Sequence, residues 1–372
     1  MRTYAIYFLP HGSLSGEEIG SDTLFGAVCW AIEILKLKDI SEMLKGFETH
    51  PLFAFSSAFP FWSYNGCLTR FYPNPLLPGL SPDQVNRLAE EEPKLKVIEK
   101  AKIIKKSAWV SEALFFEIVR GECDLEGLCH RLVHRGAHPR DVEKQGLFLM
   151  SYEERTRLQM FERLQPLKSC DVPRNQIDRV QGTTAEGLLF TDSQLFFARG
   201  AGLWCLMRAE GETVEALIRP AFRYLADTGI GGERTVGKGH FNIKIEEAPS
   251  PPDTGESANS LLTLSYYLPA GGELQLDLVG YAGYNLVHRW ARRESKFPQA
   301  SAGQTSPPVY KRLVRLFAPG SIFPLTERKE IYGRLALVVP DGEGPWPVWQ
   351  SGLAIGAFAH ISQENREKDE RH

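Results

Sequence analysis

Apolar and polar positions follow two different periods along the first 250 residues of the chain. Residues Thr3 to Leu9 are mostly aromatic or aliphatic, which is typical of a buried strand. A stretch with helical spacing follows, and its apolar face consists of Leu24, Val28, Ala31, Ile32 and Leu35. Leu52 to Phe59 is again apolar and predicts a second strand. The chain therefore opens with a strand, a helix and a strand.

The segment before the first helix has the composition of a loop, and the residues that follow it are typical of a helix N-terminus. It runs from His11 to Gly20 and is rich in glycine and serine. Ser21 is predicted as the N-cap and Asp22 as an acid in the first turn. Both residue types satisfy the unpaired amides and the positive end of a helix.

The same order of elements returns after residue 202. Leu203 to Arg208 suits a strand. The apolar face of a helix follows at Val214, Leu217, Ala221, Phe222 and Leu225. Gly229 stands where a left-handed C-terminal stop is expected. Apolar side chains then alternate with polar ones from Phe241 to Glu246, which predicts a half-buried strand.

The two strand–helix–strand units together predict an α+β fold whose first part is one ferredoxin-like (RRM-like) unit. The first unit covers residues 1–247 and carries a long insertion at about 60–200. A polar, proline-rich linker is predicted at 248–259, and a smaller, degenerate, β-rich unit at 260–361. The charged tail 362–372 is predicted to be disordered.

Less regular segments give weaker patterns. Within the insertion, Trp109 to Val119 is apolar, and Cys129 to Gln165 is predicted to be mainly helical with a break at Pro139. Strands are predicted in the last unit at Leu261–Leu268, Leu274–Val279, Leu313–Phe317, Tyr332–Val339 and Leu353–Ile361.

Composition narrows the class of protein without naming one. The 372 residues are 43% hydrophobic and 24% charged, with a net charge of −3, so bulk charge gives no nucleic-acid signal. The sequence offers neither a membrane-spanning apolar run nor a secretory signal. Six scattered cysteines disfavour a disulfide scaffold and favour a reducing cytoplasm.

A glycine-rich segment, GIGGERTVGKG at residues 229–239, is the strongest candidate for a ligand-binding loop. Glycine permits positive φ, and successive amides in such a loop can surround an anion, with Arg234 and Lys238 adding charge. Phosphate loops of nucleotide cofactors lie between a strand and a helix, whereas this one lies between a helix and a strand. A nucleic-acid backbone and a ligand-free glycine turn therefore both remain open.

Two basic stretches add charge elsewhere. Lys94 to Lys106 holds six lysines and one glutamate, which suits either a solvated helix face or RNA phosphates. Tyr284 to Arg315 holds seven basic residues and one glutamate, interleaved with aromatic residues. Its arginines Arg289, Arg292 and Arg293 are candidates for contact with RNA or with a partner subunit.

At this point the motifs resemble a family. GIGGERTVGKGHF is similar to the glycine-rich loop of RAMP proteins, the RNA-binding subunits of CRISPR effectors. SDTLFGAVCWAI at 21–32, RNQIDRVQGTTAEGLLF at 174–190, LLTLSYYLP at 261–269 and FAPGSIF at 317–323 resemble further elements of one subgroup, the second of them an internal hairpin. The blocks span residues 1–361 in order, although residues 120–165 match nothing in the family.

The resembled subgroup implies a fold of two ferredoxin-like (RRM-like) units, the C-terminal one degenerate and β-rich. It also implies a function for the chain. It is the non-catalytic subunit of type III-A (Csm) effector complexes that holds the repeat-derived 5′ handle of crRNA. Such a subunit also contacts the large polymerase-nuclease subunit and the backbone RAMP subunit, meets target RNA only indirectly, and uses no cofactor, metal or membrane. The implied RNA-binding residues are Ser21, Asp22, Arg174, Asn175, Arg179, Gly231, Gly232, Arg234, Gly237, Lys238 and His240, to which the basic cluster at Arg289, Arg292 and Arg293 is added.

Two chemical alternatives stay open beside the handle-binding function. His11 lies in the loop after the first strand, where a histidine would serve as the base of a RAMP-type endoribonuclease that processes guide precursors. A zinc site is the other, with candidate ligands Cys123, Cys129, His130, His134 and His138. Its cysteine spacing fits no standard pattern, and an ordinary basic helix explains the same residues.

A scaffold subunit that binds only proteins is a third alternative. The aromatic residues Phe59, Phe61, Trp62 and Tyr64 would either form such an interface or belong to the core. Asp178 and Arg179 are similarly ambiguous, because a local salt bridge would brace the hairpin without any RNA.

Overall fold

The computed structural model describes residues 1–16, 18–158, 165–178, 183–275, 282–290, 312–339 and 347–361. Side chains are described in these ranges except at 176–178 and 183–189. Arg179, Arg292, Arg293, most of the strand predicted at Leu274–Val279 and the tail 362–372 lie outside the described residues. Within the described ranges no helix is long and apolar enough to cross a membrane.

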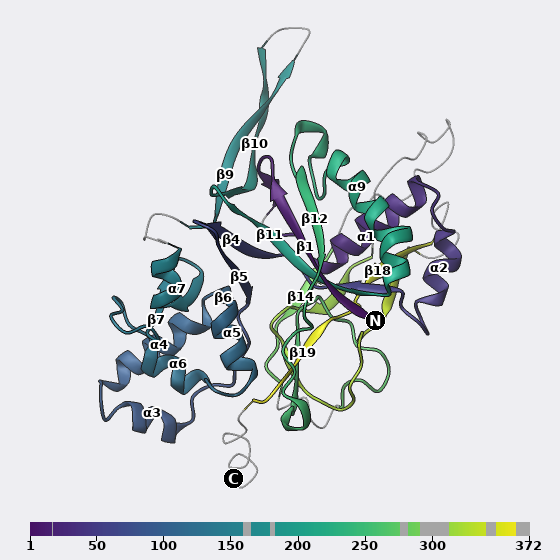
Figure 1. Ribbon diagram of the computed structural model, residues 1–372. Coiled ribbons are helices and arrows are strands. Elements are labelled where there is room, and N and C mark those ends of the chain that lie inside the picture. The colour runs from purple at the N-terminus through teal and green to yellow at the C-terminus, as the bar shows by residue number, and fades with distance from the viewer. Residues whose placement is uncertain are drawn as a thin grey trace.

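A large mixed sheet forms the centre of the α+β fold (Figure 1). Strand β1 (Arg2–Pro10) lies between β12 (Phe241–Glu247) and β11 (Ala201–Ala209), antiparallel to both. On its far side β11 pairs with β3 (Phe53–Phe55) and then with β4 (Phe59–Tyr64). The strands predicted at Leu203–Arg208 and Phe241–Glu246 are thus confirmed as the two neighbours of β1.

The insertion extends the same sheet. After β4 the order continues through β5 (Cys67–Pro73), β6 (Trp109–Ser111), β8 (Phe148–Ser151) and β7 (Val142–Gln145), with β6 and β8 parallel. Five helices gather around this end and form a lobe on the left of Figure 1. They are α3 (Pro82–Leu88), α4 (Lys94–Lys105), α5 (Glu112–Val119), α6 (Leu125–Arg131) and α7 (Tyr152–Arg157).

Helices α1 (Ser21–Ile34) and α2 (Ile40–Gly46) lie on the other side of the molecule, where α1 packs beside α9 (Arg219–Thr228). Every predicted inward residue of these helices is buried except Leu35, which caps α1 and is 39% exposed. Directly before α9 the helix passes through α8 (Gly211–Thr213) and a wide π-type turn, η1 (Val214–Ile218). The pattern changes beside Pro220, because proline has no N–H to donate to the preceding turn.

The part after residue 260 is built of short strands, as the apolar pattern predicts. Its described strands include a three-stranded sheet of β16 (Ile322–Pro324), β13 (Ser260–Thr263) and β19 (Gly356–Ala359). A two-stranded ribbon consists of β14 (Leu286–Arg289) and β15 (Val314–Phe317). Another consists of β17 (Leu335–Val339) and β18 (Val348–Ser351). Just before it, the short 3-10 turn η3 (Gly255–Ser257) lies within the predicted linker.

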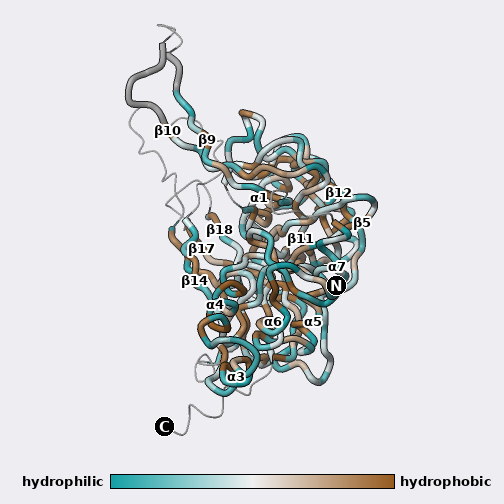
Figure 2. The backbone as a smooth tube through the Cα atoms, turned by 90° about the vertical axis from the view of Figure 1, so that its left-hand side faces the viewer, coloured by the Kyte–Doolittle hydropathy of each residue, from teal (hydrophilic) through white to brown (hydrophobic). Residues whose placement is uncertain are grey.

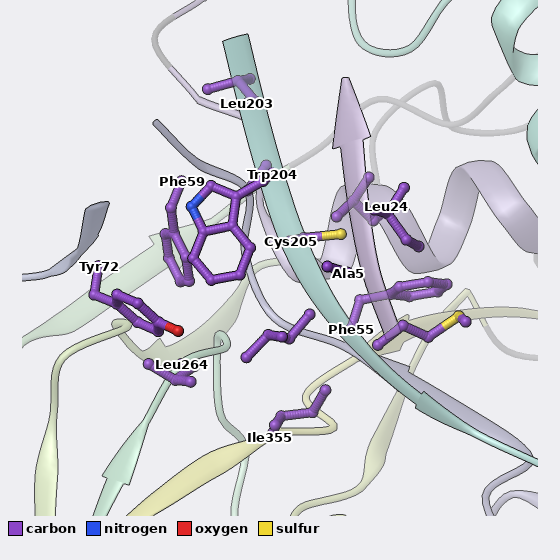
Figure 3. Packing of buried hydrophobic residues seen from close by; sticks show 14 of the residues in the cluster. Ala5, Leu24, Phe55, Phe59, Tyr72, Leu203, Trp204, Cys205, Leu264 and Ile355 are labelled. Atoms are coloured by element: carbon purple, nitrogen blue, oxygen red, sulfur yellow. The ribbon is translucent and has the colours of Figure 1, made fainter. Parts of the chain in front are cut away.

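One continuous hydrophobic core joins the sheet, the insertion and the C-terminal part. In Figure 3, Trp204 of β11 and Phe59 of β4 lie on one side of Leu264 and Ile355. The buried indole N–H of Trp204 donates to the carbonyl oxygen of Phe71 at 3.2 Å, so the ring is buried without an unpaired donor. Phe59, Phe61 and Trp62 are each at most 3% exposed, so these aromatic residues belong to the core.

A buried hydroxyl fastens the C-terminal part to the sheet. Ser265 donates from Oγ to the carbonyl oxygen of Phe55 at 2.8 Å and accepts the amide of Ile355 at 3.0 Å. Both partners of this interior hydroxyl are backbone groups of different elements, and each would be costly to leave unpaired.

A long hairpin stands away from the body at the end of β1 (Figures 1 and 2). It consists of β9 (Leu167–Asp178) and β10 (Thr183–Phe197), and β10 also pairs with β2 (Leu14–Ser15). The hairpin predicted at Arg174–Phe190 is confirmed, and it is longer than the quoted motif.

Two predicted elements are wrong. Cys129–Gln165 is not mainly helical: α6 ends at Arg131, Leu132 turns extended to bridge Val142, and the β7–β8 hairpin follows with Gly146 at φ +59°. The strand predicted at Leu52–Phe59 is broken between β3 and β4. At this break the amide of Ser56 donates to the carbonyl oxygen of Leu206, and the hydroxyl of Ser56 accepts the Leu206 amide. Strand β11 therefore pairs with two short strands, β3 and β4, in place of one long strand.

Candidate nucleic-acid interface

The glycine-rich loop folds back on the segment that follows β1. The Gly239 amide donates to the carbonyl oxygen of Ser13 at 3.1 Å, and the Ile230 amide donates to that of Gly239 at 2.8 Å. Gly239 has φ +67°, and a Cβ there would collide with the Ile230 carbonyl oxygen. Glycine is therefore required at this position by both conformation and space, and it closes the base of the loop.

The tip of the loop exposes backbone instead. Gly231, Gly232 and Gly237 are exposed, with φ +92° at Gly231 and +86° at Gly237. Glu233 takes a left-handed conformation, φ +54°, before the short turn η2 (Arg234–Val236). Gly229 ends α9 with φ +82°, which confirms the predicted stop. The tip is thus a set of alternating turns, which is a geometry typical of anion-binding loops. Within it the Gly237 amide donates to the carbonyl oxygen of Arg234 at 3.0 Å, whereas Gly231 and Gly232 lie before this turn.

Asp192 of β10 joins the loop to the hairpin. Its carboxylate lies 3.5 Å from Nζ of Lys238 and 3.5 Å from Nε of Arg174. Lys238 is 5% exposed, and its Nζ also lies 3.4 Å from Oγ of Ser13. Gln194 supports the carboxylate from beside it, donating from Nε2 to Asp192 at 2.8 Å. One acid therefore holds two of the predicted phosphate-binding cations.

A second carboxylate completes this cluster. Arg174 lies 3.3 Å from Glu233 at the tip of the glycine-rich loop, and its side chain is 29% exposed. Lys238, Arg174, Asp192 and Glu233, called the hairpin–loop cluster below, balance two positive charges with two negative ones. Sequence reasoning missed both acids, although Glu233 stands inside the quoted glycine motif.

Two histidines lie at the rim of this surface. The His11 amide donates to the carbonyl oxygen of His240 at 2.9 Å, so the two residues face each other across the end of the β1–β12 pair. The ring nitrogen Nε2 of His240 lies 3.1 Å from the carbonyl oxygen of Arg234, and His11 is exposed. Asn175, another predicted site residue, is exposed on β9 opposite Leu189.

Ser21 and Asp22 have interior roles. Gly20, and not Ser21, is the N-cap of α1. The Ser21 hydroxyl instead accepts the amide of Tyr266 at 2.9 Å, and both Ser21 and Asp22 are less than 9% exposed. The prediction of a Ser21 cap is wrong because the residue is drawn to a backbone donor of the C-terminal part.

Arg289 fills the space in front of this helix start. Its guanidinium forms a two-pronged ion pair with Asp22 at 3.0 and 3.1 Å, contacts Glu18 at 3.0 Å, and lies 4.5 Å from the ring centroid of Tyr266. Burial by itself lowers the pKa of Arg289, but the Asp22 carboxylate outweighs it and raises the pKa overall. The arginine is committed to the junction between α1 and β14, apart from the hairpin–loop cluster.

The lysine-rich helix does not join the candidate surface. In α4, Val97 and Ile104 are buried, and its lysines lie along the other sides, with Lys100 paired to Glu92 at 2.6 Å. Figures 1 and 2 place α4 at the end of the molecule opposite the hairpin.

The structure does not bring the candidate zinc residues together as a ligand set. Because α6 ends at Arg131, His130 and His134 do not share a helix face, and His130 lies 3.2 Å from Glu91. Burial raises the pKa of the Cys123 thiol to about 11 and that of Cys129 to about 12, so both stay protonated at neutral pH. Among the described residues no three His, Cys, Asp or Glu side chains are grouped to hold a metal ion.

Comparison with known proteins finds curated relatives and solved structures that are similar to this chain. No protein-family model matches the sequence. The CRISPR-system protein Csm4 of Mycobacterium tuberculosis (strain CDC 1551 / Oshkosh) is 38% identical over 127 residues, which are 34% of this chain and 39% of that relative. The match thus spans about two fifths of the relative's length.

Solved structures are similar over nearly the whole chain. In a Csm3–Csm4 subcomplex of a type III-A CRISPR-Cas interference complex, the likeness covers 96% of this chain and 98% of the other, with TM-score 0.58 and 14% identity. In a Csm1–Csm4 cassette bound to pppApA, the coverage is 98% and 100%, with TM-score 0.56 and 18% identity.

The solved structures show that the chain shares their fold. Together with the curated relatives they support a Csm4-like protein of the RAMP class.

Proposed function

We propose that the chain is a non-catalytic subunit of a type III-A CRISPR (Csm) effector complex that holds the 5′ handle of crRNA. The observation that carries the proposal is the convergence of the hairpin and the glycine-rich loop on Asp192, which brings Arg174 and Lys238 together. The proposed handle surface consists of Arg174, Asn175, Gly231, Gly232, Arg234, Gly237, Lys238 and His240.

The handle surface would act by positioning RNA. The amides of the exposed residues Gly231 and Gly232 suit phosphate oxygens, and arginine suits a two-pronged contact with the same group. The Gly237 amide donates to the carbonyl oxygen of Arg234 at 3.0 Å and shapes the turn instead. Splayed handle bases would be read by side chains along the hairpin. Because Asp192 and Glu233 neutralise the two cations, a bound phosphate would replace a carboxylate as the partner of Arg174.

Protein partners follow from the same likeness. We propose contacts with a large polymerase-nuclease subunit and with a backbone RAMP subunit, because the similar solved structures are complexes with Csm1 and with Csm3. We also propose that residues 1–247 form a ferredoxin-like unit. The antiparallel order β12–β1–β11–β3, with α1 and α9 as the connecting helices, supports it. Residues 260–361 would be a degenerate second unit.

Binding of RNA to the purified chain tests the proposal. The ligands are a guide RNA with its 5′ repeat tag, the same RNA with a scrambled tag, and the RNA without it. We expect preference for the authentic tag, and a loss of about tenfold or more in Arg174→Ala with Arg234→Ala. The slope of log affinity against log salt should fall by about 0.7 for each lost phosphate contact with a single strand.

Arg120→Ala is the matched control, because Arg120 is exposed on the insertion lobe and pairs weakly with Glu122 at 3.9 Å. Equal affinity of the double variant and this control would exclude the handle surface. If the isolated chain binds no RNA, the same variants are compared in the complex reconstituted with its Csm1-type and Csm3-type subunits.

A RAMP-type endoribonuclease is the second candidate, and one contact favours it. His240 faces His11 across the end of β1, so a second histidine is present beside the proposed base. Cleavage of a guide precursor in the absence of metal, abolished by His11→Ala, would support this function in place of the first. Unchanged precursor after prolonged incubation with the folded chain would exclude it.

A further inference from the structure

Strand β12 is at one end of the nine-stranded sheet, beside α9 (Figure 1). It pairs with β1 along one side, and no strand among the described residues pairs with its other side. An unpaired strand side presents a row of amide and carbonyl groups to which another strand can add. This side of β12 is called the β12 edge.

The register shows which residues face the β12 edge. Opposed residues of β1 and β12 include Ile6 with Ile245 and Phe8 with Ile243. The amide of Ala248 donates to Thr3, and that of His11 donates to His240, so these are hydrogen-bonded pairs. Such pairs alternate along an antiparallel ladder. Ile243 and Ile245 are the intervening residues, and their N–H and C=O groups therefore point away from β1.

The side chains of the same two residues line a groove. Ile243 and Ile245 form one wall, and α9 forms the other, around a hollow of about 150 Å³. The residues contributed by α9 are Arg219, Phe222, Arg223 and Ala226. Backbone groups and an apolar hollow are thus offered at one place, which is what strand addition by a peptide uses for affinity and for specificity.

Charged side chains of both signs flank the groove. Arg219 is occupied by Glu215 at 2.7 Å, but no ion pair involving Arg223 is found in the described part of the chain, and Arg223 is exposed. Asp227 lies one turn further along α9. On the opposite face of β12, Lys244 pairs with Glu246. Among the described residues, Arg223 is therefore a cation of the groove without an ion pair, whereas Lys244 on the other face is paired.

We propose that the β12 edge binds an extended segment of a partner protein, which adds a strand to the sheet. Groove-facing positions of that segment carry apolar side chains, and one carries a carboxylate that pairs with Arg223. RNA does not fit this site, because a nucleic-acid backbone has no alternating amide ladder to match Ile243 and Ile245. This interaction goes beyond crRNA binding and involves a different part of the molecule.

A synthetic peptide tests the proposal on the full chain without RNA. The probe has valine, valine and glutamate at alternate positions with threonine between them. Residues directly opposed in a ladder share a face, so the valine and glutamate amides should bond to β12. We expect N-methylation of those amides to abolish binding and N-methylation of the threonine amides to leave it unchanged.

Hydrogen exchange locates the peptide. On binding, the amides of residues 243 and 245 should become protected, whereas those of 242 and 244 are already protected by β1. Arg223→Glu should weaken the peptide about fivefold or more, and a lysine in place of its glutamate should do the same to the wild-type chain. Arg120→Glu, on the insertion lobe, should change nothing.

Three results would each overturn the proposal. One is equal binding by the two methylated peptides, and another is peptide protection at some other segment. The third is protection of the amides of 243 and 245 in the free full-length chain, because a segment of the chain itself would then occupy the β12 edge.

Discussion

Asp192 illustrates how one residue can prepare a surface for an anion. Its carboxylate holds Lys238, which is nearly buried, and Arg174, which is partly exposed. A lysine with so little contact with water needs a charged partner, since an unpaired buried charge is costly. The ion pair between Asp192 and Arg174 must break if an RNA phosphate is to bind Arg174. Asp192 therefore contributes to stability, and under the proposed function it would compete with RNA phosphate for Arg174.

Asp192→Asn should separate these two effects. We expect the free energy of unfolding to fall by about 1–3 kcal/mol, because Lys238 loses its charged partner. We also expect affinity for RNA to rise a few-fold, with a steeper salt dependence, because Arg174 loses one of its two competing carboxylates. Denaturant unfolding and RNA titrations at several salt concentrations measure the two quantities.

Asp171→Asn is the control on the same hairpin, where Asp171 accepts a hydrogen bond from Ser193 on the exposed side. A fall in RNA affinity of folded Asp192→Asn, with Asp171→Asn unchanged, would contradict the competition between carboxylate and phosphate. It would show that Asp192 positions Arg174 for RNA.

Among the elements, the glycine-rich loop combines a fixed base with an exposed tip. At the base, Gly239 has both a positive φ and a carbonyl oxygen in the place of a Cβ. At the tip, Gly237 has φ +86° but nothing within 4 Å of an added Cβ. Any other residue at either position would be strained by the left-handed conformation. At Gly239 an added Cβ would also collide with a neighbouring backbone atom.

Gly239→Ala should consequently cost more than Gly237→Ala. The strained conformation alone is worth about 1–3 kcal/mol, and at Gly239 the loop must also move away from Ile230. We expect Gly239→Ala to lower the melting temperature further and to weaken binding of tagged RNA, measured by thermal unfolding and RNA titration. Equal effects of the two substitutions would mean that the base of the loop is not fixed by this contact.

Local sequence patterns correctly predicted the elements whose apolar residues follow a single period. The strands around β1, the inward face of α1 and α9, the hairpin and the stop at Gly229 all follow from period, spacing and glycine placement. The prediction of a mainly helical segment from Cys129 to Gln165 was wrong because apolar and basic residues there have no single period. Its chain direction is set by distant pairing, such as the bridge of Leu132 to Val142, which no local pattern contains.

The candidate site was predictable in its cations and not in its anions. Arginine and lysine between glycines suggest phosphate, so Arg234 and Lys238 stood out. Asp192 lies 46 residues before Lys238 in the sequence, and only the pairing of β10 with β2 brings it to the loop. The opposite holds for Asp22 and Arg289, whose residue types suggested RNA although they pair with each other inside the molecule.

For the whole molecule, the continuous core bears on how the parts unfold. The linker at 248–259 suggests two separable domains. Leu264 and Ile355 nevertheless pack in the same hydrophobic cluster as Phe55 and Trp204, and Ser265 bonds to the backbone on both sides. A part whose apolar surface is covered by its neighbour loses that cover when the neighbour unfolds, so we expect one cooperative transition.

Leu264→Ala tests this coupling, because Leu264 is fully buried at the contact between the two parts. The substitution should lower the free energy of unfolding by about 2–5 kcal/mol, the usual range for removing a buried leucine side chain. With a single cooperative unit, slow-exchanging amides of β1 and of β13 should accelerate by the same factor in native-state hydrogen exchange. Faster exchange in β13 alone, with β1 unchanged, would show two domains that unfold independently on either side of the linker.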